Sequence, residues 1–136
     1  MRAIRHRLTV FACKGMRYMI LGIGVDIVEI ARVEHVIKNP RFLERNYSEK
    51  EREFLLAKKN PARSAAMNFA AKEAFAKALG TGVRGFGLRQ VEVLRNASGK
   101  PVIQLYGEAK QVAEQVGATN FLVSLSDSRD NAIAFV

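Results

Sequence analysis

Residues 61–79 have the sequence PARSAAMNFAAKEAFAKAL, in which alanine is the commonest residue and apolar side chains fall on nearly every side of a helix. Asn60 followed by Pro61 is typical of a helix start, because asparagine favours the N-cap and proline the first helical position. Gly80 follows the stretch and is a natural terminator. A helix that is apolar all round has to be covered by other elements, so we expect this one at the centre of the fold.

The segment N-terminal to this helix, residues 19–30, has the sequence MILGIGVDIVEI and predicts a β-strand rich in β-branched residues. Because side chains alternate along a strand, Ile23, Val25 and Ile27 share one face. The opposite face carries small, acidic and apolar residues, namely Gly22, Gly24, Asp26 and Val28. We expect the strand to lie in the core, with the glycines leaving open space beside Asp26 that a ligand could occupy.

Further elements are predicted on both sides of the central helix. An amphipathic helix should follow the first strand and end at Asn39-Pro40. Ser48 and Glu51 have the spacing of a capping box and predict a helix that runs towards Lys58. The C-terminal half predicts strands over 90–95, 101–106, 121–126 and 132–136, a turn over 96–99 and a short helix over 108–116. The sequence therefore predicts a small single α+β domain, with an antiparallel sheet packed on a long apolar helix.

The composition limits the class of protein. The chain has 136 residues, of which 49% are hydrophobic and 26% charged, as in an ordinary soluble globular domain. Its single cysteine, Cys13, excludes an internal disulfide framework and suits a reducing compartment. No apolar run approaches the roughly 20 residues that a membrane helix needs. We therefore expect a cytoplasmic protein that does not insert into a membrane.

The basic charge is unevenly distributed. The formal net charge is +9, and five of these charges lie in residues 1–18, which contain no acid. A second methionine, Met19, directly precedes the first predicted strand. We interpret residues 1–18 as a dispensable N-terminal extension and residues 19–136 as the functional domain, although a role as a basic arm stays open. The moderately basic domain favours acidic or phosphorylated partners.

Two carboxylates lie where a carboxylate is costly. Asp26 interrupts a predicted core strand, and Glu73 lies on the apolar helix, so each needs a partner. A structural role is sufficient for both: Asp26 could cap a neighbouring turn, and Glu73 could pair with Lys77 at the i, i+4 spacing. Spacing alone does not make these acids a metal motif.

Several motifs, taken together, resemble the holo-(acyl-carrier-protein) synthase family of 4′-phosphopantetheinyl transferases. The two strongest are GIGVDIVEI at residues 22–30 and FAAKEAFAKALGTG at residues 69–82. NASGKP at residues 96–101 and SLSD at residues 124–127 follow in the expected order. The resemblance extends over residues 19–136 and implies the 4′-phosphopantetheinyl transferase fold.

This resemblance implies a reaction and the residues that perform it. Members transfer 4′-phosphopantetheine from coenzyme A to a serine of apo acyl carrier protein, releasing adenosine 3′,5′-bisphosphate, in fatty acid biosynthesis. Asp26 and Glu73 are implied as Mg²⁺ ligands, and Lys77 as a positive charge at the diphosphate. Glu73 and Lys77 are then the catalytic residues, although the general base stays open. Carboxylates that hold Mg²⁺ together with substrate phosphates agree with the known preferences of this ion.

The remaining motifs are implied in binding. Residues expected to border the coenzyme A nucleotide are Lys77, Gly80, Thr81, Gly82, Asn96, Gly99, Lys100 and Pro101. Arg32, Arg41 and Phe42, with Arg45 as a further candidate, are expected to meet the acidic carrier protein, although a solvated face would explain these arginines equally well. The family is typically a homotrimer with active sites between subunits, and we expect the same here.

Two positions depart from the pattern of the family. Many members have an arginine where this chain has Asn68, so Arg63 or another residue is expected to supply the missing phosphate contact. Many also have a histidine where this chain has Asp127, which we interpret as a variant.

Two alternative functions stay open from the sequence. A basic module that binds nucleic acid or an acidic protein would fit the charge, but no nucleic-acid-binding motif occurs and the basic residues are scattered. A transferase serving carrier domains of polyketide or peptide synthases is the nearer alternative. The short chain favours the fatty-acid enzyme, and we expect no nucleic-acid partner.

Overall fold

A computed structural model describes residues 19–136 of the chain. Its helices are α1 (Ile30–Val36), α2 (Pro40–Asn46), α3 (Glu49–Leu56), α4 (Pro61–Ala78) and α5 (Gly107–Gln115), with a 3₁₀ turn, η1, at Leu88–Gln90. Its strands are β1 (Val25–Glu29), β2 (Val91–Arg95), β3 (Pro101–Leu105), β4 (Ser124–Asp127) and β5 (Asn131–Phe135). The N-terminal extension lies outside the described residues.

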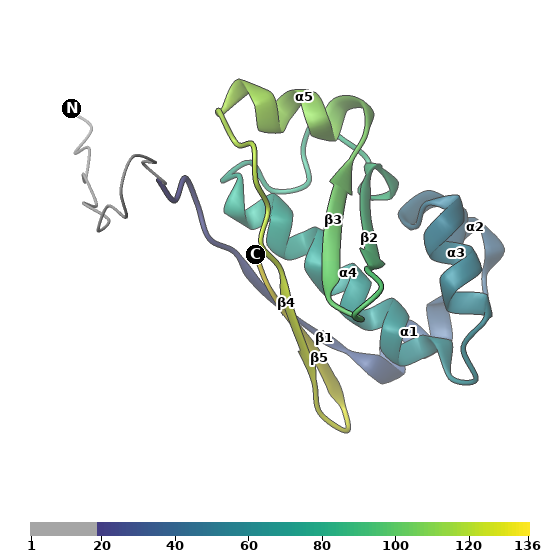
Figure 1. The fold of residues 1–136 in the computed structure, drawn as a ribbon. Coiled ribbons are helices and arrows are strands. Elements are labelled where there is room, and N and C mark those ends of the chain that lie inside the picture. The colour runs from purple at the N-terminus through teal and green to yellow at the C-terminus, as the bar shows by residue number, and fades with distance from the viewer. Residues whose placement is uncertain (1–18) are drawn as a thin grey trace.

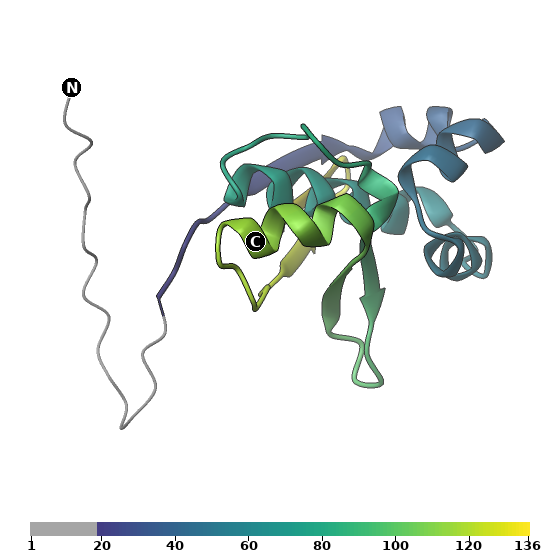
Figure 2. The same cartoon turned by 90° about the horizontal axis from the view of Figure 1, so that it is seen from above.

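Helix α4 lies at the centre of the domain, as its sequence predicts. A three-stranded antiparallel sheet, in the order β1-β5-β4, packs on one side of it, and the antiparallel β2–β3 hairpin lies on another (Figures 1 and 2). Ala70, Ala71 and Ala74 of α4 are fully buried beside Val93 of β2 and Ala134 of β5. Because alanine projects only a methyl group, strands can approach the helix closely from both sides.

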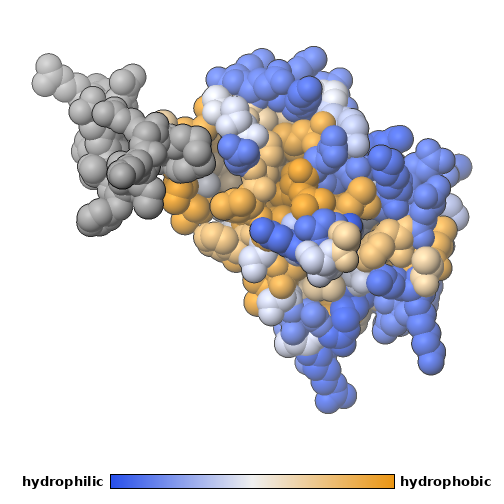
Figure 3. Space-filling model, viewed as in Figure 1, coloured by the Kyte–Doolittle hydropathy of each residue, from blue (hydrophilic) through white to orange (hydrophobic). Residues whose placement is uncertain are grey.

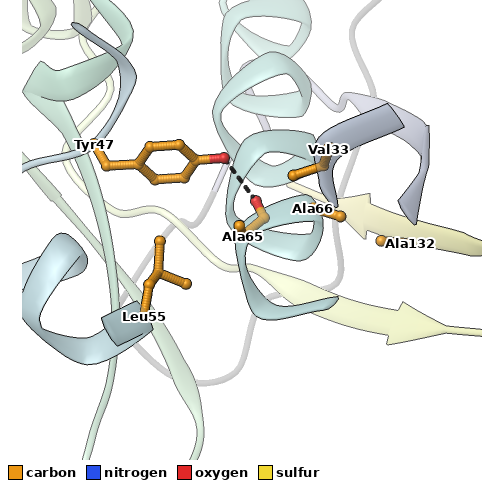
Figure 4. Packing of buried hydrophobic residues seen from close by; sticks show 6 residues of the cluster. All are labelled: Val33, Tyr47, Leu55, Ala65, Ala66 and Ala132. Atoms are coloured by element: carbon orange, nitrogen blue, oxygen red, sulfur yellow. Dashed lines mark hydrogen bonds between the residues drawn. The ribbon is translucent and has the colours of Figure 1, made fainter. Parts of the chain in front are cut away.

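The segment α1–α3 closes one end of α4 around a buried tyrosine. The Tyr47 ring packs with Val33, Leu55 and Ala66, and its hydroxyl donates to the Ala65 carbonyl oxygen at 3.0 Å (Figure 4). The capping box predicted for α3 is present. Helix α2 was not predicted: α1 ends at Val36, and the Asn39-Pro40 pair begins α2 instead of only stopping α1.

Strand β1 packs on α4 with the face that carries the glycines and Asp26. Its β-branched face points away from α4, leaving Val25 53% and Ile27 62% exposed, while Asp26 and Val28 point inward. Val25 lies opposite Phe135 and Ile27 opposite Ile133, so the outer face is apolar where β1 and β5 pair, whereas β4 adds Ser124 and Ser126 to it. Figure 3 shows hydrophobic residues gathered over the left and middle of the face drawn in Figure 1, around β4 and the segment before β1.

Within residues 19–136, none of the helices is both long enough and apolar enough to cross a bilayer.

Candidate functional site

The first motif meets α4 through its glycines. A Cβ atom on Gly24 would lie 1.9 Å from the Ala74 carbonyl oxygen, and one on Gly22 would lie 1.9 Å from the Ala78 carbonyl oxygen. The open space expected beside Asp26 is therefore absent, because the helix backbone fills it. The glycines serve a different purpose: they let β1 lie directly against α4, which brings Asp26 beside the last turns of that helix.

Asp26 pairs with Lys77 at this contact. The Lys77 Nζ donates to Asp26 Oδ1 at 2.8 Å and to the Val25 carbonyl oxygen at 3.0 Å. The Asp26 side chain is 17% exposed and that of Lys77 is 53% exposed, so the pair lies at the edge of solvent. The partner of Lys77 is thus an aspartate 51 positions away. The ion pair with Glu73, suggested by the helical spacing, is not among those formed in residues 19–136.

Glu73 completes the cluster. Partial burial raises the pKa of the Glu73 carboxyl, and the nearby negative charge of Asp26 raises it further, whereas Lys77 acts in the opposite direction. Two carboxylates that repel each other in this way bind a cation favourably. We call Asp26, Glu73 and Lys77 the acidic cluster.

The acidic cluster fits a divalent cation held partly by a substrate. The described residues contain no group of three or more Asp, Glu, His or Cys side chains arranged to hold a metal by themselves. Mg²⁺ is commonly bound by one or two carboxylates plus substrate phosphates and waters, and the donor set here is of that kind. Lys77 already places a positive charge against Asp26 and a backbone carbonyl, which shows that these oxygens accept a cation.

The GTG motif adjoins the cluster. Helix α4 ends at Ala78, and Gly80 and Gly82 adopt φ values of 74° and 61°, in the left-handed region that favours glycine. The chain therefore turns directly after Lys77, with Thr81 between the two glycines, and the loop continues to the β2–β3 hairpin.

The hairpin motif lies at the other end of α4. Strand β2 runs past the helix with Val91 beside Lys72 and Arg95 beside Asn68, so the following turn, which includes Asn96, Gly99 and Lys100, lies toward the N-terminal half of α4. Asn68 and Lys77 are nine residues apart on a continuous helix, a separation of about 13 Å at 1.5 Å per residue. The fold therefore does not bring residues 96–101 to the acidic cluster of the same chain.

The two positions that depart from the family pattern also lie toward the N-terminal half of α4. Asn68 is fully buried; its amide donates to the Val93 carbonyl oxygen at 2.9 Å, and its side-chain oxygen accepts from Arg95 Nη2 at 3.0 Å. Asp127 accepts a hydrogen bond from Arg63, an ion pair at the start of α4. The contact between Arg95 and Asn68 was not predicted from the sequence, because a lone arginine at the end of a strand belongs to no motif.

A buried ion pair was also missed. Lys72 and Glu51 are both fully buried, with Nζ and Oε2 2.7 Å apart, and Lys72 also donates to the Leu88 carbonyl oxygen at 3.0 Å. Burial lowers the pKa of the Lys72 ammonium, and the contact with Glu51 opposes that shift. The sequence does contain a signal for this pair. A lysine within an apolar helix needs an acidic partner, and the capping-box residue Glu51 supplies one. The pair links α3, α4 and the chain that enters β2.

The residues expected to meet the carrier protein divide into two groups. Arg32, Arg41 and Arg45 are exposed on α1 and α2. Phe42 is half-buried, and its ring stacks on Phe69 at a centroid distance of 6.1 Å, so it belongs largely to the core.

Comparison with known proteins identifies a consistent set of relatives. A sequence model of the 4′-phosphopantetheinyl transferase superfamily matches residues 22–136. A holo-(acyl-carrier-protein) synthase of Caldanaerobacter subterraneus is 44% identical over 117 residues, which cover 85% of this chain and 92% of the relative.

Solved structures agree with this match. The holo-(acyl-carrier-protein) synthase of Neisseria meningitidis superimposes with a TM-score of 0.80 at 36% identity, covering 86% of this chain and 96% of the other. The Helicobacter pylori synthase, solved in complex with coenzyme A, has a TM-score of 0.73 at 32% identity and covers 83% and 96% of the two chains.

Proposed function

This chain belongs to the 4′-phosphopantetheinyl transferase superfamily, and on that basis we propose that it is a transferase that moves 4′-phosphopantetheine from coenzyme A to a serine of apo acyl carrier protein. The observation that carries the proposal is the position of the acidic cluster beside the Gly80–Gly82 turn. The cluster and the turn lie in residues 22–30 and 69–82, the two motifs that most resemble those of the family. The reaction belongs to fatty acid biosynthesis, and the cysteine-poor composition suits the cytoplasm.

The chemistry follows from the charges of the cluster. The serine oxygen attacks the β-phosphorus of coenzyme A, the bond from that phosphorus to the bridging oxygen breaks, and adenosine 3′,5′-bisphosphate leaves with the electron pair. Asp26 and Glu73 would hold Mg²⁺, which when bound would neutralise charge on the diphosphate oxygens. Lys77 places its ammonium on the same diphosphate, and the serine proton passes to water beside Glu73.

A complete site needs a second subunit. The nucleotide is bordered by Lys77 and residues 80–82 of one chain and by Asn96, Gly99, Lys100 and Pro101 of a neighbour in a homotrimer. Support comes from the separation of these groups along α4, and from the exposed apolar side chains on the outer face of β1 and β5, which a second copy can cover. These side chains are Val25, Ile27, Ile133 and Phe135 of the sheet, together with Ile23 just before β1.

The carrier protein binds at the exposed arginines of α1 and α2. Arg32, Arg41 and Arg45 present positive charge to an acidic partner, which accelerates encounter more than it adds affinity. Phe42 holds α2 against the core and contributes to the surface through its exposed part.

Intact mass spectrometry tests the reaction. Apo acyl carrier protein incubated with the chain, coenzyme A and Mg²⁺ should gain one phosphopantetheine, and EDTA should prevent the gain. Asp26→Ala and Glu73→Ala should remove transfer while circular dichroism stays unchanged, because each removes a charged ligand rather than core volume. Transfer that persists in both variants would contradict the assignment of the site.

Subunit complementation tests the shared site. Asp26→Ala and Lys100→Ala should each be impaired alone, because each leaves every site short of one residue. When the two variants are refolded together, the mixture should recover up to about a quarter of the wild-type rate. Random assembly places an intact Asp26 opposite an intact Lys100 in about that share of the sites. No recovery would place both residues in one subunit's site.

A further inference from the structure

The Lys77 ammonium lies where a cation is expected in the acidic cluster. It contacts Asp26 Oδ1 at 2.8 Å and the Val25 carbonyl oxygen at 3.0 Å, so two oxygens from neighbouring residues of β1 surround one positive charge. Charged hydrogen bonds of this length are among the stronger polar contacts in proteins. A divalent cation that binds Asp26 has to share or displace this partner.

The charges of the cluster show why sharing is unfavourable. With both carboxylates ionised, Asp26, Glu73 and Lys77 carry one net negative charge, which attracts a divalent cation only weakly. Without the lysine the two carboxylates carry two negative charges. A cation and an ammonium on the same carboxylate also repel each other at short range.

Lys77 is free to move when another anion becomes available. Its side chain is 53% exposed and flexible, and it projects from the last turn of α4, directly before the Gly80–Gly82 turn. A diphosphate bound at that turn would offer the ammonium two negative charges in place of one.

We infer that Lys77 is an internal competitor for the divalent cation, which occupies Asp26 until a diphosphate draws it away. This inference rests on the proposed function, because it takes Asp26 as a metal ligand and coenzyme A as the diphosphate. Its consequence is that cation and coenzyme A bind cooperatively and that Lys77 is the source of the coupling. The cluster would then hold its cation firmly only when the substrate is present.

Direct measurement of cation binding tests this role without an activity assay. Free Mn²⁺ is titrated by electron paramagnetic resonance against wild type, Lys77→Met, Lys77→Arg and Lys110→Met, each with and without coenzyme A. Lys110 is a matched control, because it is an exposed lysine whose only ion pair within residues 19–136 is a 4.0 Å contact with Glu114 on α5.

The expected result is specific to the lost charge. Lys77→Met should bind Mn²⁺ up to about fivefold more tightly without coenzyme A, the scale of one partly exposed ion pair. Coenzyme A should then enhance Mn²⁺ binding less than in wild type. Lys77→Arg and Lys110→Met should behave as wild type. Unchanged or weaker Mn²⁺ binding by Lys77→Met, or a Lys77→Arg variant that matches it, would overturn the inference.

Asp26→Asn separates this failure from failure of the proposed function. If Asp26→Asn abolishes Mn²⁺ binding while Lys77→Met leaves it unchanged, the metal site stands and only the competitor role falls. If Asp26→Asn and Glu73→Gln both leave Mn²⁺ affinity unchanged in the presence of coenzyme A, the metal assignment falls and the inference falls with it.

Discussion

Substituting Gly24 with alanine should disrupt both the stability of the domain and its site. The added Cβ would lie 1.9 Å from the Ala74 carbonyl oxygen and 2.7 Å from the Ala78 nitrogen, both of them backbone atoms that no rotamer change can move. Ordinary contact begins at 3.4 Å, so β1 and α4 have to separate locally by about 1.5 Å, the difference between 3.4 and 1.9 Å. Overpacking of this kind costs about 1–3 kcal/mol or more.

The same displacement acts on the acidic cluster. Asp26 lies two residues after Gly24 on β1, whereas Glu73 and Lys77 lie on α4, so the separation opens the 2.8 Å Asp26–Lys77 contact. A misplacement of about 1 Å can cost about 100-fold in rate, and we expect a loss of at least this size in phosphopantetheine transfer.

Two assays and one control check this reasoning. Urea unfolding followed by circular dichroism measures the free energy of unfolding, and intact mass spectrometry of the carrier protein measures transfer. Gly87→Ala is the matched control, since Gly87 has a φ of −91° and nothing within 4 Å of an added Cβ. That variant should be neutral or up to about 1 kcal/mol more stable. A Gly24→Ala variant as stable and active as wild type would refute the role assigned to the glycines.

Three further predictions concern other parts of the chain. Lys72→Met should lower the free energy of unfolding by about 3–5 kcal/mol, because it leaves the Glu51 carboxylate buried without its ammonium partner. In the same urea assay, the double variant that also carries Glu51→Gln should recover part of this loss. Phe135→Lys should convert the trimer to monomers, as measured by native mass spectrometry, and should abolish transfer. Leu56→Lys, at an exposed position on α3, should keep both the trimer and the transfer activity. A trimeric Phe135→Lys variant would place the interface elsewhere. Deleting residues 1–18 should leave the transfer rate unchanged, and a large loss would show that these residues belong to the working enzyme.

Much of the secondary structure could be predicted from the sequence, because the signals are local. The alanine-rich run of residues 61–79, with its Asn60-Pro61 start, predicts α4, and the Ser48–Glu51 capping box predicts the start of α3; both are confirmed. Helix α2 was missed because Asn39-Pro40 is compatible with both the end of one helix and the start of the next. The sequence also indicated Asp26, Glu73 and Lys77 as candidates, since charged groups among apolar neighbours need partners.

Contacts between distant segments could not be predicted in the same way. Alternation along β1 defines two faces but not which of them meets α4, and the apolar face proved to be the exposed one. Lys77 has a helical neighbour at Glu73, yet its hydrogen bonds go to Asp26 and Val25, because the close approach of β1 puts these oxygens within reach.

Most of the elements, the central place of α4 and the residues able to do phosphate chemistry could be predicted from the sequence, because each follows from side-chain chemistry over a few turns of chain. The folded arrangement was needed to show that Gly22 and Gly24 admit a helix backbone rather than a ligand, and that Asp26 pairs with Lys77. It was also needed to show that residues 96–101 lie toward the N-terminal half of α4, away from that pair. The physical reason is that packing across the helix depends on which small residues face each other, and such matches join segments that are far apart in the chain.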